Sequence, residues 1–162
     1  MTLTKIACVA AASLAVLIGA VPGAHAQPSQ STEATRPAER KSHLVVIQVS
    51  QNDPAVMTMA LNNAENLAKY YKAKGEEAEI EFVAYGAGLS MVRDDTSPVK
   101  DRLAAISGNN KNITFSGCDN TRTNQSKMEN KEIGLVPQAR LVPSGIARIV
   151  ELQEQGWTYV RP

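Results

Sequence analysis

The stretch His43–Pro54, HLVVIQVSQNDP, decides the fold of this chain. Its first seven residues are almost all β-branched or apolar, which is typical of a strand covered on both faces and therefore of a parallel sheet. Asp53 then offers a side chain that can cap a helix, and Pro54 suits the first helical position. After Pro54, apolar residues recur at three- and four-residue spacing as far as Tyr71. This spacing predicts a helix of about five turns.

Outward from that unit, the alternation of strand and helix continues to the C-terminus. Gly75 is expected to end the first helix, because glycine readily adopts the backbone conformation that closes one. Further strands are predicted at residues 80–83, 113–115, 140–142 and 157–160. Short connections between alternating strands and helices indicate right-handed βαβ crossovers. The sequence therefore predicts an α/β fold, a three-layer α/β sandwich with a mostly parallel sheet of four to five strands.

The segments between these strands are predicted as follows. Residues 85–88 are expected to form a turn, and residues 97–108 a helix that begins with the capping pair Ser97-Pro98. Residues 119–134 have little apolar periodicity and are predicted to be a short polar helix plus a loop. Residues 144–156 are predicted to be a helix between Ser144 and Gly156. The apolar side chains expected to face inward from this last helix are Ile146, Ile149, Val150 and Leu152.

The N-terminal residues have the features of an export signal. Lys5 supplies a positive charge, residues 6–20 are an unbroken run of apolar and small residues, and residues 24–26 read Ala-His-Ala, a typical cleavage site. A signal peptide is therefore predicted at residues 1–26, and its short, alanine-rich character is typical of bacteria. Residues 27–42 contain no large apolar residue and are predicted to be a disordered tether. We expect a periplasmic or secreted product with no membrane span after cleavage.

Composition narrows the classes of function. Removal of residues 1–26 would leave 136 of the 162 residues, a normal length for one domain, here residues 43–162. It would also leave 16 basic and 16 acidic side chains, because Lys5 is the only charged residue removed. Such a neutral chain is not expected to bind nucleic acid. Cys118 would be the only thiol, so it is buried, paired between chains, or reactive.

Small or polar residues follow each predicted strand. In open parallel sheets, ligands collect beyond the carboxyl ends of the strands, where helix N-termini present free N–H groups. These residues are therefore candidates for one binding crevice, although turns and helix caps require the same residue types. The candidate ligand-binding residues are Ser50, Asn52, Tyr85, Gly86, Gly88, Gly117, Arg122, Ser144 and Gly145.

Cys118 is the candidate catalytic residue. It lies where a predicted strand gives way to a helix, and the positive end of a helix dipole favours the thiolate, which is the nucleophile. Arg122 would strengthen this effect if its side chain folded back toward the sulfur. The alternative is an inert cysteine that packs like a small hydrophobe. The single histidine after residue 26, His43, argues against a metal site, and no motif for a nucleotide cofactor occurs, so no cofactor is expected.

Several strings in the chain resemble the DsrE/DsrF-like family, and in particular an exported branch of it. They are HLVVIQVSQNDP, ALNNAENL, EFVAYGAGL, TFSGCDNT, LVPSGIARIVELQEQGW and YVRP, and together they span nearly all of residues 43–162. The resemblance implies an α/β sandwich that tends to form homo-oligomers. In the sulfur-relay members of the family, a cysteine after a central strand carries sulfur as a persulfide, and Cys118 is the position onto which that role would fall.

Two main hypotheses of function follow. In the first, the protein is a thiol-dependent sulfur carrier or sulfurtransferase, in which Cys118 takes sulfur from a donor and passes it to an acceptor thiol protein. Ser144 and Gly145 would then hold an anionic donor by their backbone N–H groups, and Gly117 would let a partner approach. In the second, the protein is a non-catalytic module that binds a small molecule or anion, and Cys118 only packs. A structural oligomer subunit is a third option.

Overall fold

The computed structural model describes residues 41–162. These residues include the whole of the predicted domain. The predicted signal peptide, with Cys8, and residues 27–40 of the predicted tether lie outside the described residues.

A five-stranded parallel sheet forms the centre of the described part of the chain. Its order is β4-β3-β2-β1-β5, and every neighbouring pair of strands is parallel. The strands are β1 Ser42–Val49, β2 Glu77–Ala84, β3 Ile113–Cys118, β4 Ala139–Val142 and β5 Thr158–Val160. The predicted parallel sheet is confirmed, and because all its strands run the same way, their carboxyl ends meet at one edge.

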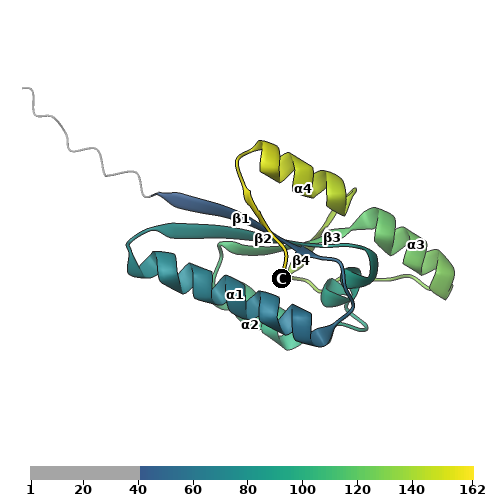
Figure 1. The fold of residues 1–162 in the computed structure, drawn as a ribbon. Helices are drawn as coiled ribbons and strands as arrows, with labels where there is room; N and C mark the ends of the chain where they lie inside the picture. Colours follow the sequence, from purple (N-terminus) through teal and green to yellow (C-terminus); the bar gives the residue numbers. More distant parts are fainter. Residues whose placement is uncertain (1–40) are drawn as a thin grey trace, which may run out of the picture. The chain divides into compact units, whose positions relative to one another are not determined.

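Helices cover both faces of this sheet, which gives three layers (Figure 1). One face carries α1 and α2, and the other carries α4. A 3₁₀ helix, η1, also packs on the α1 side, and α3 projects beyond the carboxyl end of β3. The helices are α1 Pro54–Ala73, η1 Gly86–Val92, α2 Lys100–Asn109, α3 Asp119–Glu129 and α4 Gly145–Glu154. The predicted three-layer α/β sandwich is confirmed.

The first helix begins and ends where its residues predict. The Asp53 side chain accepts hydrogen bonds from the N–H groups of Ala55 (2.8 Å) and Val56 (3.3 Å), and Pro54 occupies the first turn. After the helix, Gly75 has a φ of +74°, a conformation that costs glycine little and other residues more. These two local signals confine the helix between β1 and β2.

The two faces of the sheet have hydrophobic cores of very different size. The α1 side holds the main core, in which Phe82 and Phe115 stack with 5.2 Å between ring centroids. The α4 side has a small core made of Val46, Val83, Ile149 and Leu152. The α4 side also buries the polar side chains of Glu81 and Ser116, whereas the buried Ser90 and Arg93 belong to η1 and its C-cap.

Three local predictions need correction. Within residues 85–88, Tyr85 is the N-cap of η1 and Gly86 begins this helix, whose Leu89, Met91 and Val92 side chains enter the main core. The second helix begins at Lys100, because the Ser97 hydroxyl donates to the carbonyl of Met91 and holds a turn there. In α4 the side chains of Ile149 and Leu152 are buried, but those of Ile146 and Val150 are exposed. A single helix on a broad sheet buries one narrow stripe, and these two lie outside it.

Candidate functional site

Cys118 is the last residue of β3 and the N-cap of α3. Its sulfur accepts a hydrogen bond from the N–H of Thr121 at 3.5 Å. The residue is only 4% exposed, and it forms no disulfide within residues 41–162. On the neighbouring strand its register partner is Val142, two residues before Ser144, the N-cap of α4. The thiol therefore lies near the first turns of two helices.

The pKa of Cys118 lies below its ordinary value. Burial alone would raise the pKa of this thiol. Hydrogen bonds from the Thr121 hydroxyl and from the backbone N–H groups of Gly145, Thr121 and Asn120 outweigh burial, because they stabilise the thiolate. Gly145 begins α4, and Asn120 and Thr121 belong to the first turn of α3. Two helix N-termini thus converge on one sulfur atom, as the position of the cysteine predicts for α3 alone.

The Thr121 hydroxyl connects Cys118 with the start of η1. The N–H of Gly86 donates to Thr121 Oγ1 at 3.0 Å, and the Gly86 carbonyl accepts from Gln125 Nε2 at 3.1 Å. These bonds hold α3 against the segment that follows β2. The Thr121 hydroxyl can therefore direct its own proton to the sulfur while its oxygen accepts the Gly86 N–H.

Beside the thiol, a buried ionic cluster lies between the sheet and α4. Glu81 of β2 is 1% exposed, and its Oε1 accepts hydrogen bonds from Ser116 Oγ (2.6 Å) and Arg148 Nε (3.0 Å). Its Oε2 accepts from Arg140 Nη2 and Arg148 Nη2, both at 2.8 Å. Burial would raise the pKa of Glu81, but these bonds outweigh it and the pKa is lowered. No spacing in the sequence predicts this cluster, which we call the Glu81 cluster.

A groove of about 300 Å³ runs between β4 and α4. One end lies at the Glu81 cluster, and the other lies at Ser144, next to the helix start that contacts Cys118. The residues that line it are Arg140, Leu141, Val142, Pro143, Ser144, Ala147, Arg148 and Glu151. Val142, which lines this groove, is the register partner of Cys118.

Four of the predicted ligand-binding residues gather around Cys118. Gly145 lies against the Tyr85 ring, where an added Cβ would be 2.8 Å from Tyr85 Cβ, so glycine is required for this close packing. Gly86 joins the cluster through Thr121, as described above. Ser144 caps α4 by accepting the N–H of Ala147 at 3.4 Å, and it also lines the groove. Gly145 therefore contacts the sulfur through its N–H, whereas Tyr85, Gly86 and Ser144 adjoin the thiol through Gly145, Thr121 and the start of α4.

Two further candidates lie at the end of β1 and serve local structure. Ser50 Oγ accepts from Gln48 Nε2 at 3.0 Å, and Asn52 Oδ1 accepts from the Ser90 hydroxyl at 2.7 Å. Gly88 lets η1 approach this strand, because a Cβ there would be 2.3 Å from the Val49 carbonyl oxygen. Ser50, Asn52 and Gly88 thus form a separate group that joins β1 to η1.

The roles predicted for Gly117 and Arg122 do not fit the structure. A Cβ on Gly117 would be 2.8 Å from Leu135 Cδ1 and close to Val92 and Leu89, so this glycine allows core packing rather than the approach of a partner. Arg122 Nε donates to Asp119 Oδ1 at 2.8 Å, and its Nη1 donates to the Ile133 carbonyl at 3.4 Å. Its guanidinium is therefore held by these two oxygens and does not fold back toward the sulfur.

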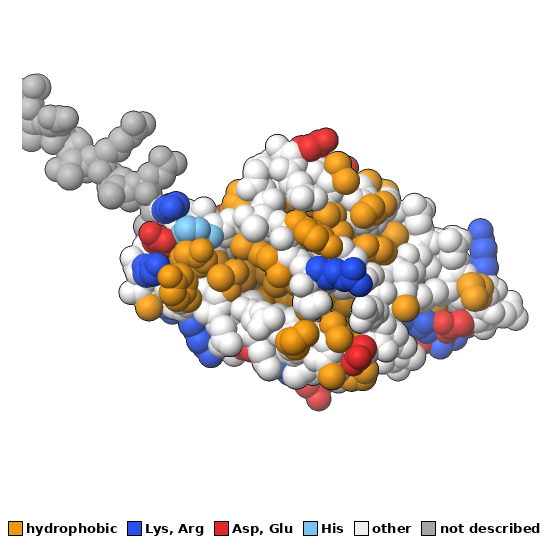
Figure 2. Space-filling model, in the orientation of Figure 1, with side chains coloured by type: hydrophobic (Ala, Val, Ile, Leu, Met, Phe, Trp, Pro, Cys, Tyr) orange, Lys and Arg blue, Asp and Glu red, His pale blue; other side chains and the backbone are white. Residues whose placement is uncertain are grey.

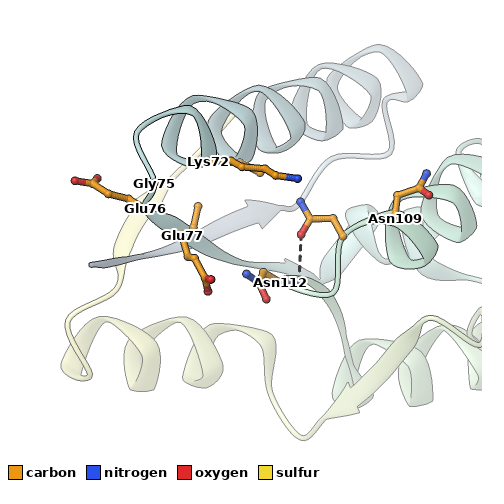
Figure 3. Close-up of a pocket in the computed structure, with 9 residues that line it drawn as sticks. Lys72, Gly75, Glu76, Glu77, Asn109 and Asn112 are labelled. Carbon is orange, nitrogen blue, oxygen red and sulfur yellow. Dashed lines mark hydrogen bonds between the residues drawn. The ribbon is translucent and has the colours of Figure 1, made fainter. Parts of the chain in front are cut away.

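A second pocket, of about 280 Å³, lies at the opposite edge of the sheet, where β2 and β3 begin (Figure 3). It is bordered by the end of α1 and by the asparagine-rich segment 109–112. In Figure 3 the Lys72 side chain extends toward that segment, whereas Glu76 points away from it. Asn112 N–H donates to Asn110 Oδ1 at 3.2 Å, which closes the turn into β3. Because this pocket is at the amino ends of the strands, it lies far from Cys118 along β3.

Within residues 41–162 no group of three or more metal-ligating side chains is close enough to hold a metal ion. The His43 ring stacks on Tyr71 with 3.5 Å between centroids, and its Nε2 lies 2.6 Å from Glu76 Oε2.

No helix among the described residues is long and apolar enough to span a bilayer. Apolar side chains do gather on the surface over α4 (Figure 2), where Ile146 and Val150 are exposed.

The comparisons with known proteins support the fold. The chain is similar to a solved structure of a protein of unknown function, MTH1491 from Methanobacterium thermoautotrophicum. The sequence identity is 27%, the TM-score is 0.60, and the match covers 76% of this chain and 100% of that chain. Neither the protein-family models nor the curated proteins give a match. The neighbour has no assigned function, so the likeness carries the α/β architecture and no activity.

Proposed function

We propose that this protein is a thiol-dependent sulfur carrier, or sulfurtransferase, in which Cys118 holds sulfur as a persulfide. The observation that carries the proposal is the convergence of the α3 and α4 N-termini on the Cys118 sulfur, with the lowered pKa that results. A thiolate is needed to attack a sulfane sulfur, and the same N–H groups would stabilise the negative charge of a persulfide. The resemblance to the DsrE/DsrF-like family is a prediction that agrees with this role.

The proposed reaction has two displacements. In the first, the Cys118 thiolate attacks the outer sulfur of a donor such as thiosulfate, the S–S bond of the donor breaks, and sulfite leaves with the bonding electron pair. The resulting persulfide retains the negative charge of the attacking thiolate. In the second, the thiolate of an acceptor protein attacks the outer sulfur, which forms the acceptor persulfide and releases the Cys118 thiolate. No net oxidation occurs, so no redox cofactor is required.

The proposed setting is extracytoplasmic, because residues 1–26 have the features of a signal peptide. Donor and acceptor would then differ from those of a cytosolic relay. The homo-oligomer expected from the family resemblance stays a prediction, and Ile146 and Val150 of α4 are the exposed apolar side chains that a second copy would cover.

Intact mass spectrometry tests the proposal. The purified, reduced protein is treated with thiosulfate or polysulfide, and Cys118→Ser is treated in parallel. We expect wild type to gain the mass of sulfur, to lose it again on addition of a thiol, and the variant to gain none. Equal sulfur gain by both proteins, or no gain by either, would contradict the proposed role of Cys118.

One observation favours a second candidate, a non-catalytic module that binds small anions. The Cys118 residue is 4% exposed, which also suits a packing role. In that case ligand binding would survive Cys118→Ser. It would be lost in Ser144→Trp, because a large side chain at this position would fill the groove that Ser144 lines. Sulfur loading of wild type that is lost in Cys118→Ser would favour the carrier instead, whether or not the variant still binds the ligand.

A further inference from the structure

The groove between β4 and α4 combines a held cation with an apolar wall. Arg140 Nε donates to Ser116 Oγ at 3.1 Å, and Arg140 Nη2 donates to Glu81 Oε2 at 2.8 Å. Within residues 41–162, Arg140 Nη1 has no hydrogen-bond acceptor, and the side chain is 54% exposed. The guanidinium is therefore fixed in place by two bonds and retains donors for a ligand.

The charge around this end of the groove favours an anion. Two guanidinium groups, those of Arg140 and Arg148, share the single buried carboxylate of Glu81. Glu151 also faces Arg148, but its carboxylate is 3.8 Å away and 58% exposed, so water screens it. One of the two positive charges is therefore not neutralised by Glu81, and a ligand anion at Arg140 would neutralise it. The Arg140 side chain is already held in place, so binding would not cost the entropy of ordering it.

The wall of the groove between Arg140 and Ser144 is apolar, and Glu151 lines the groove beside Arg148. Val142, Pro143 and Ala147 line it between Arg140 and Ser144. Its volume of about 300 Å³ lies at the lower limit of ordinary small-molecule sites. A free inorganic anion would leave this wall uncovered, whereas an organic anion with a small apolar group would cover it.

We propose that this groove binds a small organic anion, with its sulfonyl oxygens at Arg140, its terminal sulfur directed along Val142 toward the start of α4, and its apolar group against Pro143 and Ala147. The inference deepens the proposed function and rests on it in one respect: the anion is identified as the sulfur donor, an organic thiosulfonate. The reason is position, because Val142 is the register partner of Cys118, and the groove ends at the helix start whose Gly145 N–H contacts the sulfur.

The chemistry of such a donor balances without a cofactor. The Cys118 thiolate attacks the terminal sulfur of R–SO₂–S⁻, a new S–S bond forms to Cys118, and the bond between the two donor sulfurs breaks. The sulfinate R–SO₂⁻ leaves with the electron pair. Donor and leaving group both carry one negative charge, so Arg140 can face an anion throughout the step.

The binding test uses benzenesulfonate, which has the same anionic and apolar parts but no transferable sulfur. Its affinity for Cys118→Ser is measured by calorimetry, alone and combined with Arg140→Gln, Ala147→Phe or Arg102→Gln. Ala147 is an exposed helix residue that lines the groove and takes no part in the hydrogen bonds of the Glu81 cluster, so its replacement is expected to block the groove and leave the ion pairs in place. Arg102 pairs with Glu65 on another surface and serves as the matched control.

We expect Arg140→Gln and Ala147→Phe each to weaken benzenesulfonate binding by about tenfold or more, and Arg102→Gln to leave it unchanged. Undetectable binding in the parent, or equal binding in Ala147→Phe, would overturn the inference. A second measurement compares sulfur loading of wild type by benzenethiosulfonate and by thiosulfate, with faster loading by the organic donor expected and the preference lost in Ala147→Phe.

The two measurements separate the inference from the proposed function. Sulfur loading from thiosulfate without benzenesulfonate binding would overturn the groove as a donor site and leave Cys118 as a carrier. Benzenesulfonate binding that depends on Arg140 and Ala147, without sulfur loading from either donor, would support the groove as an organic-anion site and overturn the carrier.

Discussion

Replacement of Glu81 by glutamine should expose how far the α4 layer depends on one buried charge. The side chain is 1% exposed and accepts four hydrogen bonds, two on each oxygen. Glutamine keeps the shape and one acceptor oxygen. Its amide nitrogen, however, would face the Nη2 groups of Arg140 and Arg148, so two charge-assisted bonds are lost and donors meet donors.

The size of the effect follows from these contacts. A hydrogen bond to a charged group contributes about 1.5–3 kcal/mol net, and removal of one partner of a buried ion pair costs about 3–5 kcal/mol. The side chain of Arg140 is 54% exposed and that of Arg148 is 24% exposed, so water will solvate part of the charge left behind. We therefore expect Glu81→Gln to lower the free energy of unfolding by about 3 kcal/mol, equivalent to roughly 10 °C in Tm.

The pH dependence has a definite sign. Burial raises the pKa of Glu81, but the hydrogen bonds from Arg148, Ser116 and Arg140 outweigh it, so the folded-state pKa lies below the ordinary value of 4.5. A carboxyl of this kind stabilises the fold above its unfolded-state pKa, and the stabilisation is lost as the pH falls toward the folded-state pKa. The stability difference between wild type and Glu81→Gln should be constant near neutral pH and should narrow below about pH 4.

Urea unfolding followed by circular dichroism measures both effects. Glu79→Gln is the matched control, because Glu79 lies two residues earlier on the same strand and face but is exposed, with Ser42 Oγ at 3.2 Å. Its effect should stay within about 0.5 kcal/mol. The reasoning would be refuted if Glu81→Gln changed stability by less than about 1 kcal/mol, or if its deficit persisted undiminished at pH 3.

Three further predictions concern the thiol, the glycines and the second ionic cluster. Thr121→Val removes a hydroxyl that lowers the pKa of Cys118, so the pH profile of iodoacetamide alkylation should shift upward, and Thr121→Ser should restore it. Gly88→Ala should strongly lower Tm, because the added Cβ would lie 2.3 Å from the Val49 carbonyl oxygen. Gly108→Ala in α2, where no atom lies within 4 Å of an added Cβ, should raise the free energy of unfolding by up to about 1 kcal/mol. Equal changes of Tm in the two variants would contradict the packing argument. Arg93→Met should lower Tm at pH 7, since Arg93 is buried and donates hydrogen bonds to Asp95 and Glu129. The loss of Tm should shrink below about pH 4, because the Arg93 hydrogen bond keeps the pKa of Asp95 well below its ordinary value. A loss of Tm that is independent of pH would exclude this pairing as its cause.

The element order could be predicted because its signals are local. The apolar run of β1, the Asp53 cap and Gly75 each specify backbone conformation within a few residues, and the structure retains all three. The η1 helix could not be predicted in this way. Gly86 and Gly88 are typical of a turn, and only the packing of Leu89 and Met91 in the main core shows that residues 86–92 continue as a helix.

The Glu81 cluster was missed for a related reason. Glu77, Glu79 and Glu81 occupy alternate positions along β2 and therefore share one face of the strand. This pattern indicates a face that is exposed to solvent. Its partners are 59 and 67 residues away in Arg140 and Arg148, and α4 covers only the third glutamate. Burial of this carboxylate depends on where α4, which is distant in the sequence, packs on the sheet. The residue spacing within β2 does not predict that position.

The position of α4 links the two parts of the candidate site. Arg148 ties the middle of the helix to Glu81, and Gly145, one turn earlier, presents the N–H that contacts the Cys118 sulfur. The Glu81 carboxylate therefore helps to set the placement of the N–H that lowers the pKa of the thiol. If α4 shifts when that carboxylate is lost, the folded Glu81→Gln protein should be alkylated at Cys118 with a higher pKa, although residue 81 does not touch the sulfur. An unchanged alkylation profile in the folded variant would mean that Tyr85, which packs against Gly145, holds the helix start without help from the ion pairs.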